Sequence, residues 1–173
     1  MKMMCAKILI FFVTTFVLMS CSLFFGSNDK IDLKSHNYQV LRLDLEKNST
    51  WQLMQNEKNE SDIAFKQNKT GAIISLNSVC KKTQKSLKDL MGALLLDLNS
   101  TTQPQTQEVL IDGTQALAAD VQTKTSDGIT ILIRAIVLYK SGCTFDLLYI
   151  ASQSVFKEQY ASFERFLKGF HVQ

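Results

Sequence analysis

The sequence predicts an α+β domain in which an antiparallel sheet packs against two main helices. Three observations support this fold class. Between residues 108 and 151, apolar segments alternate with short turns that contain glycine, as in strands joined by hairpins. Near residues 86–98 and 154–170, apolar residues instead recur at helical spacing. The 173 residues suffice for one domain with a real core and leave little room for a second.

The clearest strand pattern is a meander of four segments in the second half of the chain. Consecutive segments are separated by Asp112-Gly113, Asp127-Gly128 and Ser141-Gly142. Asp-Gly is favoured where a tight hairpin requires positive φ. The predicted strands are Glu108–Ile111, Thr114–Lys124, Ile129–Tyr139 and Cys143–Ala151.

Two strand pairs are expected in the first half of the chain. Apolar and polar residues alternate from Tyr38 to Leu45, as in a half-buried strand, and Thr50–Leu53 is its expected short neighbour. The second pair consists of Asp62–Gln67 and Gly71–Val79, joined by a polar turn. The expected sheet therefore contains strand pairs plus a four-strand meander.

Each of the two predicted helices has one apolar face. The first begins at Ser86, where Asp89 three residues later resembles a capping box. Its apolar residues are Leu87, Leu90, Met91, Leu94 and Leu98. The second runs from about Ser154 to Phe170 and carries the stripe Phe156, Tyr160, Phe163, Leu167 and Phe170. Such a stripe is typical of a core, so this helix is expected to lie across the sheet.

The N-terminus has the features of an export signal. Met1–Lys7 is basic, and the apolar run Ile8–Met19 is shorter than a membrane-spanning helix requires. Leu18-Met19-Ser20-Cys21 then resembles a bacterial lipobox, which implies that Cys21 carries the lipid. Two or more buried acyl chains anchor a protein durably. We expect a signal peptide over residues 1–20, a lipidated tether over 21–36 and the domain over 37–173.

Two alternatives to lipidation remain open at the N-terminus. Residues 8–25 could stay attached as an uncleaved membrane anchor, because residues 20–25 carry no charge. The chain could also be secreted without lipid. The residue after Cys21 is Ser22, where an Asp would indicate retention at the inner membrane of enteric bacteria. The expected location is therefore the cell envelope, facing the periplasm, with the outer membrane favoured.

Cys80 and Cys143 are the two cysteines that remain once Cys5 leaves with the signal and Cys21 is acylated. In an oxidising compartment such a pair forms a disulfide. Cys80 ends a predicted strand and Cys143 begins another, so the two can meet across neighbouring strands. The alternatives are two inert buried thiols or a metal pair, although cysteines without nearby His or acidic partners make a poor zinc site.

The charge balance argues against a nucleic-acid-binding domain. Removing Lys2 and Lys7, which lie in the signal, from the 19 basic residues leaves 17 against 16 acidic ones. A nearly neutral domain lacks the basic stripe that nucleic-acid binding requires. The hydrophobic fraction of 46% and the charged fraction of 20% also argue against wholesale disorder.

No catalytic residue, cofactor site or metal site is expected. The two histidines, His36 and His171, lie in the tether and near the C-terminus, and both are expected to be solvated. Nucleophile-elbow, phosphate-loop and zinc-protease motifs do not occur in the sequence. Arg134 and Asp146 each interrupt an apolar strand. They could pair across the meander, although two residues on the solvent face are the favoured interpretation.

The end of the meander and the last helix carry a family resemblance. The run Cys143-Thr-Phe-Asp-Leu-Leu-Tyr-Ile-Ala-Ser152, followed by Phe156 and Phe163-Glu-Arg-Phe166, resembles the C-terminal strand and helix of Mog1/PsbP-like proteins. The stretch Ala72-Ile-Ile-Ser-Leu-Asn-Ser-Val-Cys80 is similar to strands of related, DcrB-like bacterial lipoproteins. The group includes a photosystem II subunit, a nuclear-transport GTPase cofactor and envelope proteins. The resemblance therefore implies accessory or binding work, and it transfers no functional residue.

The leading functional hypothesis is a non-enzymatic accessory or protein-interaction module of the bacterial cell envelope. It would be held to membrane lipid through Cys21 and would have an envelope protein as partner. The alternative is a domain that binds a small molecule or lipid between sheet and helices, in a pocket lined by residues such as Trp51 and Met91. An enzyme whose groups are not revealed by sequence spacing is the third possibility.

Overall fold

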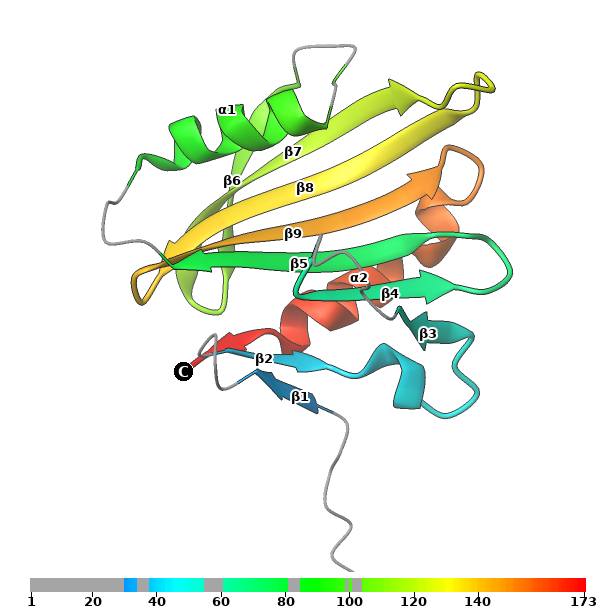
Figure 1. Ribbon diagram of the computed structural model, residues 1–173, viewed down its shortest axis with the longest axis horizontal. Helices are drawn as coiled ribbons and strands as arrows, with labels where there is room; N and C mark the ends of the chain where they lie inside the picture. The colour runs from blue at the N-terminus through cyan, green and yellow to red at the C-terminus, as the bar shows by residue number, and fades with distance from the viewer. Residues whose placement is uncertain (1–29, 34–37, 55–60, 81–84, 99, 101–103) are drawn as a thin grey trace, which may run out of the picture.

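The computed structural model describes residues 30–33, 38–54, 61–80, 85–98, 100 and 104–173. These residues form an α+β fold, so the predicted fold class is confirmed. All of its paired strands are antiparallel, and they belong to one large and one small sheet (Figure 1).

The large sheet contains seven strands in the order β3-β4-β5-β9-β8-β7-β6. The predicted meander is confirmed, because β6, β7, β8 and β9 pair consecutively, and β9 then pairs with β5. The strands are β3 (Trp51–Leu53), β4 (Ile63–Gln67), β5 (Ile73–Cys80), β6 (Thr106–Ile111), β7 (Thr114–Lys124), β8 (Thr130–Lys140) and β9 (Cys143–Ser152).

Two of the three glycine-containing turns of the meander are tight hairpins with positive φ at both central residues. The φ angles are 49° at Asp112 and 70° at Gly113, and 51° at Ser141 and 81° at Gly142. In the third turn only Gly128 has a positive φ, because this loop is longer and is closed by a hydrogen bond from the Thr125 amide to the Ile129 carbonyl. The turn residues thus fix the register of the whole meander.

The two helices cover opposite faces of the large sheet (Figure 1). Helix α1 (Leu87–Asp97) lies on β7 and β8, and helix α2 (Phe156–Gly169) packs on β9. The expected cap is present at α1: the Asp89 amide donates to Ser86 Oγ at 3.1 Å, and Ser86 Oγ donates back to the Asp89 carboxylate at 2.6 Å.

The small sheet was only partly expected. It contains β1 (Lys30–Leu33), β2 (Tyr38–Leu41) and β10 (His171–Val172), with β2 in the centre. The predicted strand from Tyr38 to Leu45 is too long, because a 3-10 turn replaces its second half at Leu43–Leu45. Its expected pairing with Thr50–Leu53 is also wrong, because β3 pairs with β4 in the large sheet. The strand β1 lies within the range expected for the tether. This sheet packs on the α2 side through contacts between β2 and α2.

Each face of the large sheet has its own buried cluster of apolar side chains. The larger cluster lies under α2 and includes Phe65, Phe145, Tyr149, Phe163 and Phe166. The smaller cluster lies under α1 and consists of Met91, Leu117, Ala119 and Val137. Because both faces are covered, the central part of β8 is buried without alternation from Ala135 to Leu138.

Candidate functional site

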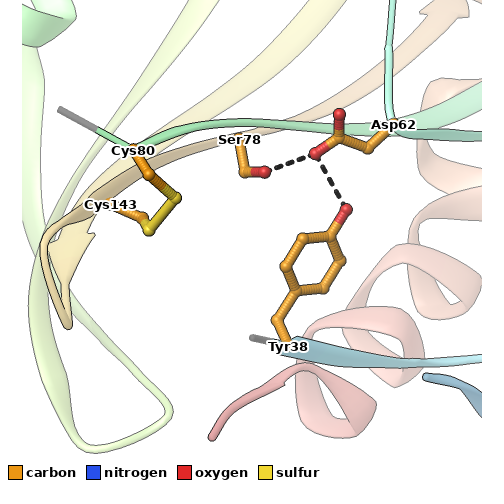
Figure 2. Close-up of a disulfide and its surroundings, with 5 residues drawn as sticks. All are labelled: Tyr38, Asp62, Ser78, Cys80 and Cys143. Atoms are coloured by element: carbon orange, nitrogen blue, oxygen red, sulfur yellow. Dashed lines mark hydrogen bonds between the residues drawn. A yellow bond between two sulfur atoms is a disulfide. The ribbon is translucent and has the colours of Figure 1, made fainter. Parts of the chain in front are cut away.

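The predicted disulfide partners lie directly opposite each other in the large sheet. Cys80 is the last residue of β5, Cys143 is the first residue of β9, and the two are register partners. Their Sγ atoms are 2.03 Å apart, the distance of a disulfide bond (Figure 2). The oxidation state of the pair in the cell stays a prediction. Cys21 and His36, by contrast, lie outside the residues that the structure describes.

A buried tyrosine links the small sheet to the large one near this disulfide (Figure 2). The Tyr38 hydroxyl donates to Asp62 Oδ2 at 2.9 Å, and Ser78 Oγ donates to the same atom at 2.5 Å. Burial, followed by the Asp62 charge, raises the pKa of Tyr38 far above its ordinary value. The phenol therefore stays protonated and acts as a structural donor rather than a base.

A groove of about 410 Å³ lies beside α2, between this helix and the β6–β8 part of the large sheet. Val109, Ile111 and Ile136 form its apolar floor. Tyr160, Glu164, Leu167 and Lys168 form its wall along α2. Its volume falls within the range of small-molecule sites. We define these residues, together with Arg134 and Asp112, as the α2 groove.

Arg134 is the charged residue on the floor of the α2 groove. Its side chain is only 14% exposed, and its Nη1 donates to Asp120 Oδ2 at 3.0 Å. Its Nε is buried and has no hydrogen-bond partner among the described residues. Tyr160 lies beside it: burial raises the pKa of Tyr160, and the Arg134 charge, together with a hydrogen bond between the two side chains, partly offsets this effect. The groove therefore contains a buried donor without an acceptor.

Asp112 closes the other end of the α2 groove. Its Oδ2 accepts from Lys140 Nζ at 2.5 Å and from the Val172 amide at 2.9 Å, and its Oδ1 lies 2.8 Å from His171 Nδ1. Burial opposes ionisation, yet these partners lower the pKa of Asp112 to about 2. His171 was expected to be solvated, and its ring is 58% exposed while it contacts Asp112.

A second hollow, of about 340 Å³, lies under α1 on the opposite face of the large sheet. Leu90, Leu94 and Val79 line it together with Asp97 and Asp146. Burial, and then the nearby Asp97 charge, raises the pKa of Asp146 to about 6. This carboxyl group therefore titrates close to neutral pH.

No protein-family model matches the sequence, and no curated protein matches it. Solved structures do share its architecture. The cyanobacterial PsbP of Synechocystis sp. has a TM-score of 0.55 at 10% identity, over 83% of this chain and 91% of that one. The Ran-binding protein Mog1p of Saccharomyces cerevisiae has a TM-score of 0.53 at 13% identity, over 83% and 94%. The domain has the Mog1/PsbP-like fold.

Two bacterial structures share the Mog1/PsbP-like fold as well. LpqN of Mycobacterium tuberculosis, described as involved in cell envelope biogenesis, has a TM-score of 0.55 at 10% identity, over 72% of this chain and 79% of that one. A protein of Bacteroides thetaiotaomicron has a TM-score of 0.54 at 11% identity, and this chain spans 45% of it. At such identities the likeness shows the fold alone.

In this Mog1/PsbP-like domain, two expectations about polar and aromatic residues are wrong. Arg134 and Asp146 lie on opposite faces of the sheet. The register partner of Asp146 is Val137, which lies three residues from Arg134 on β8, and side chains an odd number of residues apart on a strand point to opposite faces. They neither pair nor share a solvent face. Trp51 and Met91 fill separate cores on opposite faces and line neither the α2 groove nor the hollow under α1.

Among the described residues of the Mog1/PsbP-like domain, no group of three or more His, Cys, Asp or Glu side chains is arranged to hold a metal ion. Within the same part of the chain, no helix is long and apolar enough to cross a membrane.

Proposed function

We propose that this chain is a bacterial lipoprotein whose Mog1/PsbP-like domain is a non-enzymatic accessory module of the cell envelope. The observation that carries the proposal is the motif Leu18-Met19-Ser20-Cys21 at the end of a basic and then apolar segment. Lipidation of Cys21 would hold the domain at a membrane. The function of the domain there would be to bind an envelope protein. Ser22 favours the outer membrane.

The fold supports an accessory role. Of the proteins that share it, Mog1p is described as Ran-binding and LpqN as involved in cell envelope biogenesis. A pair of cysteines at disulfide distance also suits an exported protein, because disulfides persist outside the cytosol.

The anchor is tested by comparing Cys21→Ser with wild type in bacteria fed labelled palmitate. We expect the wild-type chain to incorporate label and to sediment with membranes, and the variant to lose the label. The matched control is Cys5→Ser, which changes a thiol that leaves with the signal and should alter neither result. Label in the Cys21→Ser protein would overturn the lipoprotein assignment.

The accessory role is tested by cross-linking in intact cells, followed by affinity capture and mass spectrometry. One stoichiometric envelope protein, present with wild type and lost with Cys21→Ser, is the expected result. If neither sample yields a partner, the interaction module is the wrong assignment and ligand binding takes its place.

Ligand binding is the second candidate, and the α2 groove is the observation that favours it. The groove combines an apolar floor with a largely buried arginine, a combination that is typical of small-molecule sites. The pocket that Trp51 and Met91 were expected to line, between sheet and helices, is not this groove, so the candidate rests on different residues from those expected.

A further inference from the structure

The contacts of Arg134 with Asp120 and Tyr160 leave one donor of its guanidinium, Nε, without a partner among the described residues. Its neighbours on β8 are Ile133 and Ala135, both buried, and its own side chain is largely buried on the α2 face. Its ion-pair partner Asp120 is 70% exposed, so that pair is weak. The buried Nε still lacks an acceptor among the described residues. A buried donor without a partner is destabilising, and few occur in native proteins.

We propose that the α2 groove binds a small amphiphile in which a single carboxylate ends an apolar chain, and that Arg134 receives this carboxylate. The inference makes the second candidate function specific, and it does not depend on a lipid at Cys21. It assigns a site and a ligand class that the proposed accessory role does not require.

The Nε side of the Arg134 guanidinium determines which ligand head group the groove can bind. Nη1 already donates a hydrogen bond to Asp120, whose carboxylate is mostly exposed to solvent. The Nε edge remains, and arginine characteristically holds a carboxylate through two parallel N–H donors. A carboxylate here would satisfy the buried Nε and would place the negative charge against a mostly desolvated cation.

The remaining charges of the α2 groove do not oppose this assignment. Asp112 is already neutralised by Lys140 and also holds the Val172 amide. Glu164 and Lys168 are exposed and lie four residues apart on α2, where opposite charges offset each other. Arg134 is thus the charge that the buried floor presents to a ligand.

The shape of the α2 groove fits an apolar chain. Val109 and Ile111 on β6 and Ile136 on β8 supply apolar floor on the two sides of β7, and Leu167 lines the groove from α2. The groove follows β8 from Arg134 toward the Asp112 turn, so a head group at Arg134 leaves the floor free for the chain. Because Nε is buried, binding requires a side-chain movement, and half-buried Tyr160 is the neighbour placed to make it.

The test uses the full-length chain in bacterial membranes and a photoreactive decanoate that carries a diazirine on its chain. After irradiation, the labelled peptides of the protein are identified by mass spectrometry. We expect label on residues 107–112 and 160–170, with competition by unlabelled decanoate. The matching decanol and decylamine probes should label these peptides at least fivefold less, because they lack the carboxylate.

Two variants decide whether Arg134 receives the head group. Arg134→Gln should reduce decanoate labelling of the groove at least fivefold without lowering Tm, since the change removes an unsatisfied donor. Arg165→Gln removes the same charge from α2 outside the groove and should label like wild type. The same comparison in a Cys21→Ser background separates this site from the anchor.

Several outcomes would overturn the inference. Equal labelling by decanol would show an apolar groove with no carboxylate site. Unchanged labelling of Arg134→Gln would remove Arg134 from the site, and a large fall in its Tm would show a structural role for the side chain. Label spread evenly over the protein would indicate membrane partitioning only.

Discussion

The Asp112 carboxylate joins three parts of the chain: the β6–β7 turn that it occupies, Lys140 at the end of β8, and the C-terminal strand β10. Its position also requires a positive φ, which Asp and Asn tolerate better than other residues with a side chain. Its charge and its backbone conformation can therefore be tested separately.

Asp112→Asn keeps the turn and removes the charge. Because the folded pKa of about 2 lies below the ordinary 3.8, the charge stabilises the fold above pH 4, and this contribution disappears as pH falls through 2. We expect the variant to lose about 2 kcal/mol of unfolding free energy near neutral pH and almost nothing at the acid limit. Urea unfolding across this range measures the difference. Asp127→Asn, in an exposed turn, is the control, and an equal loss there would contradict the role of Asp112.

The charge of Asp146 has the opposite effect on the stability of the fold. Its folded pKa of about 6 lies above the ordinary 3.8, so the folded state holds the proton more tightly and loses stability as pH rises through 6. Asp146→Asn should therefore stabilise the protein by about 1–2 kcal/mol above pH 7 and leave it unchanged below pH 4. Thermal unfolding at both pH values checks this. A variant that is less stable at high pH would show that the carboxylate has a favourable partner.

At the scale of elements, the end of α2 lies against β2 with no room for a side chain. A Cβ added at Gly169 would lie 2.6 Å from Leu41 Cβ and 3.2 Å from the Leu41 amide nitrogen. The glycine is therefore required by the close approach of helix and strand, and its φ is not in the left-handed region.

Gly169→Ala should destabilise the protein by about 1–3 kcal/mol, because β2 or α2 must shift. Gly92, in the exposed middle of α1, has open space around the equivalent Cβ position. Gly92→Ala should instead stabilise by about 0.5–1 kcal/mol, since alanine favours the helix. Denaturant midpoints of both variants measure the contrast, and two effects of the same sign would refute the packing account.

The meander was predictable because its turns are encoded locally. With Lys124 and Thr130 paired at the end of β7 and β8, counting back along both strands pairs Asp120 with Arg134. The two-residue turn at Ser141 and Gly142 likewise places Arg134 and Asp146 on opposite faces. Both interpretations of these two residues, the favoured shared solvent face and the pair across the meander, are therefore excluded by the register, and the sequence contains the signal for it.

At the scale of the whole molecule, the small sheet and the α2 groove could not be predicted. Strand β10 contains two residues and pairs with β2, more than a hundred residues earlier in the chain. Local periodicity carries no information about such a contact. The α2 groove depends on where α2 comes to lie relative to β6, and Val109 and Arg134 show no pattern that brings them together. Tertiary packing alone creates this site.

The bond between Cys80 and Cys143 is also a property of the whole chain, because it closes a segment of 63 residues. In the chain-entropy model such a bond adds on the order of 4 kcal/mol by restricting the unfolded state. We expect reduction, or the double change Cys80→Ser and Cys143→Ser, to lower the unfolding free energy by up to this amount. Free thiols that react with an alkylating agent in the protein isolated from cells would show that the bond is not formed.

The pairing of Cys80 with Cys143 also bears on the timing of folding. In a chain exported as proposed above, Cys80 would leave the ribosome and cross the membrane well before Cys143, and its thiol would have no native partner until β9 pairs with β5. Oxidation of the pair in such an exported chain would therefore record that most of the chain has been translocated and that its central strands have aligned. A stalled or misaligned chain would keep two reactive thiols, which a cell's oxidative folding and proteolytic systems can distinguish from the finished domain.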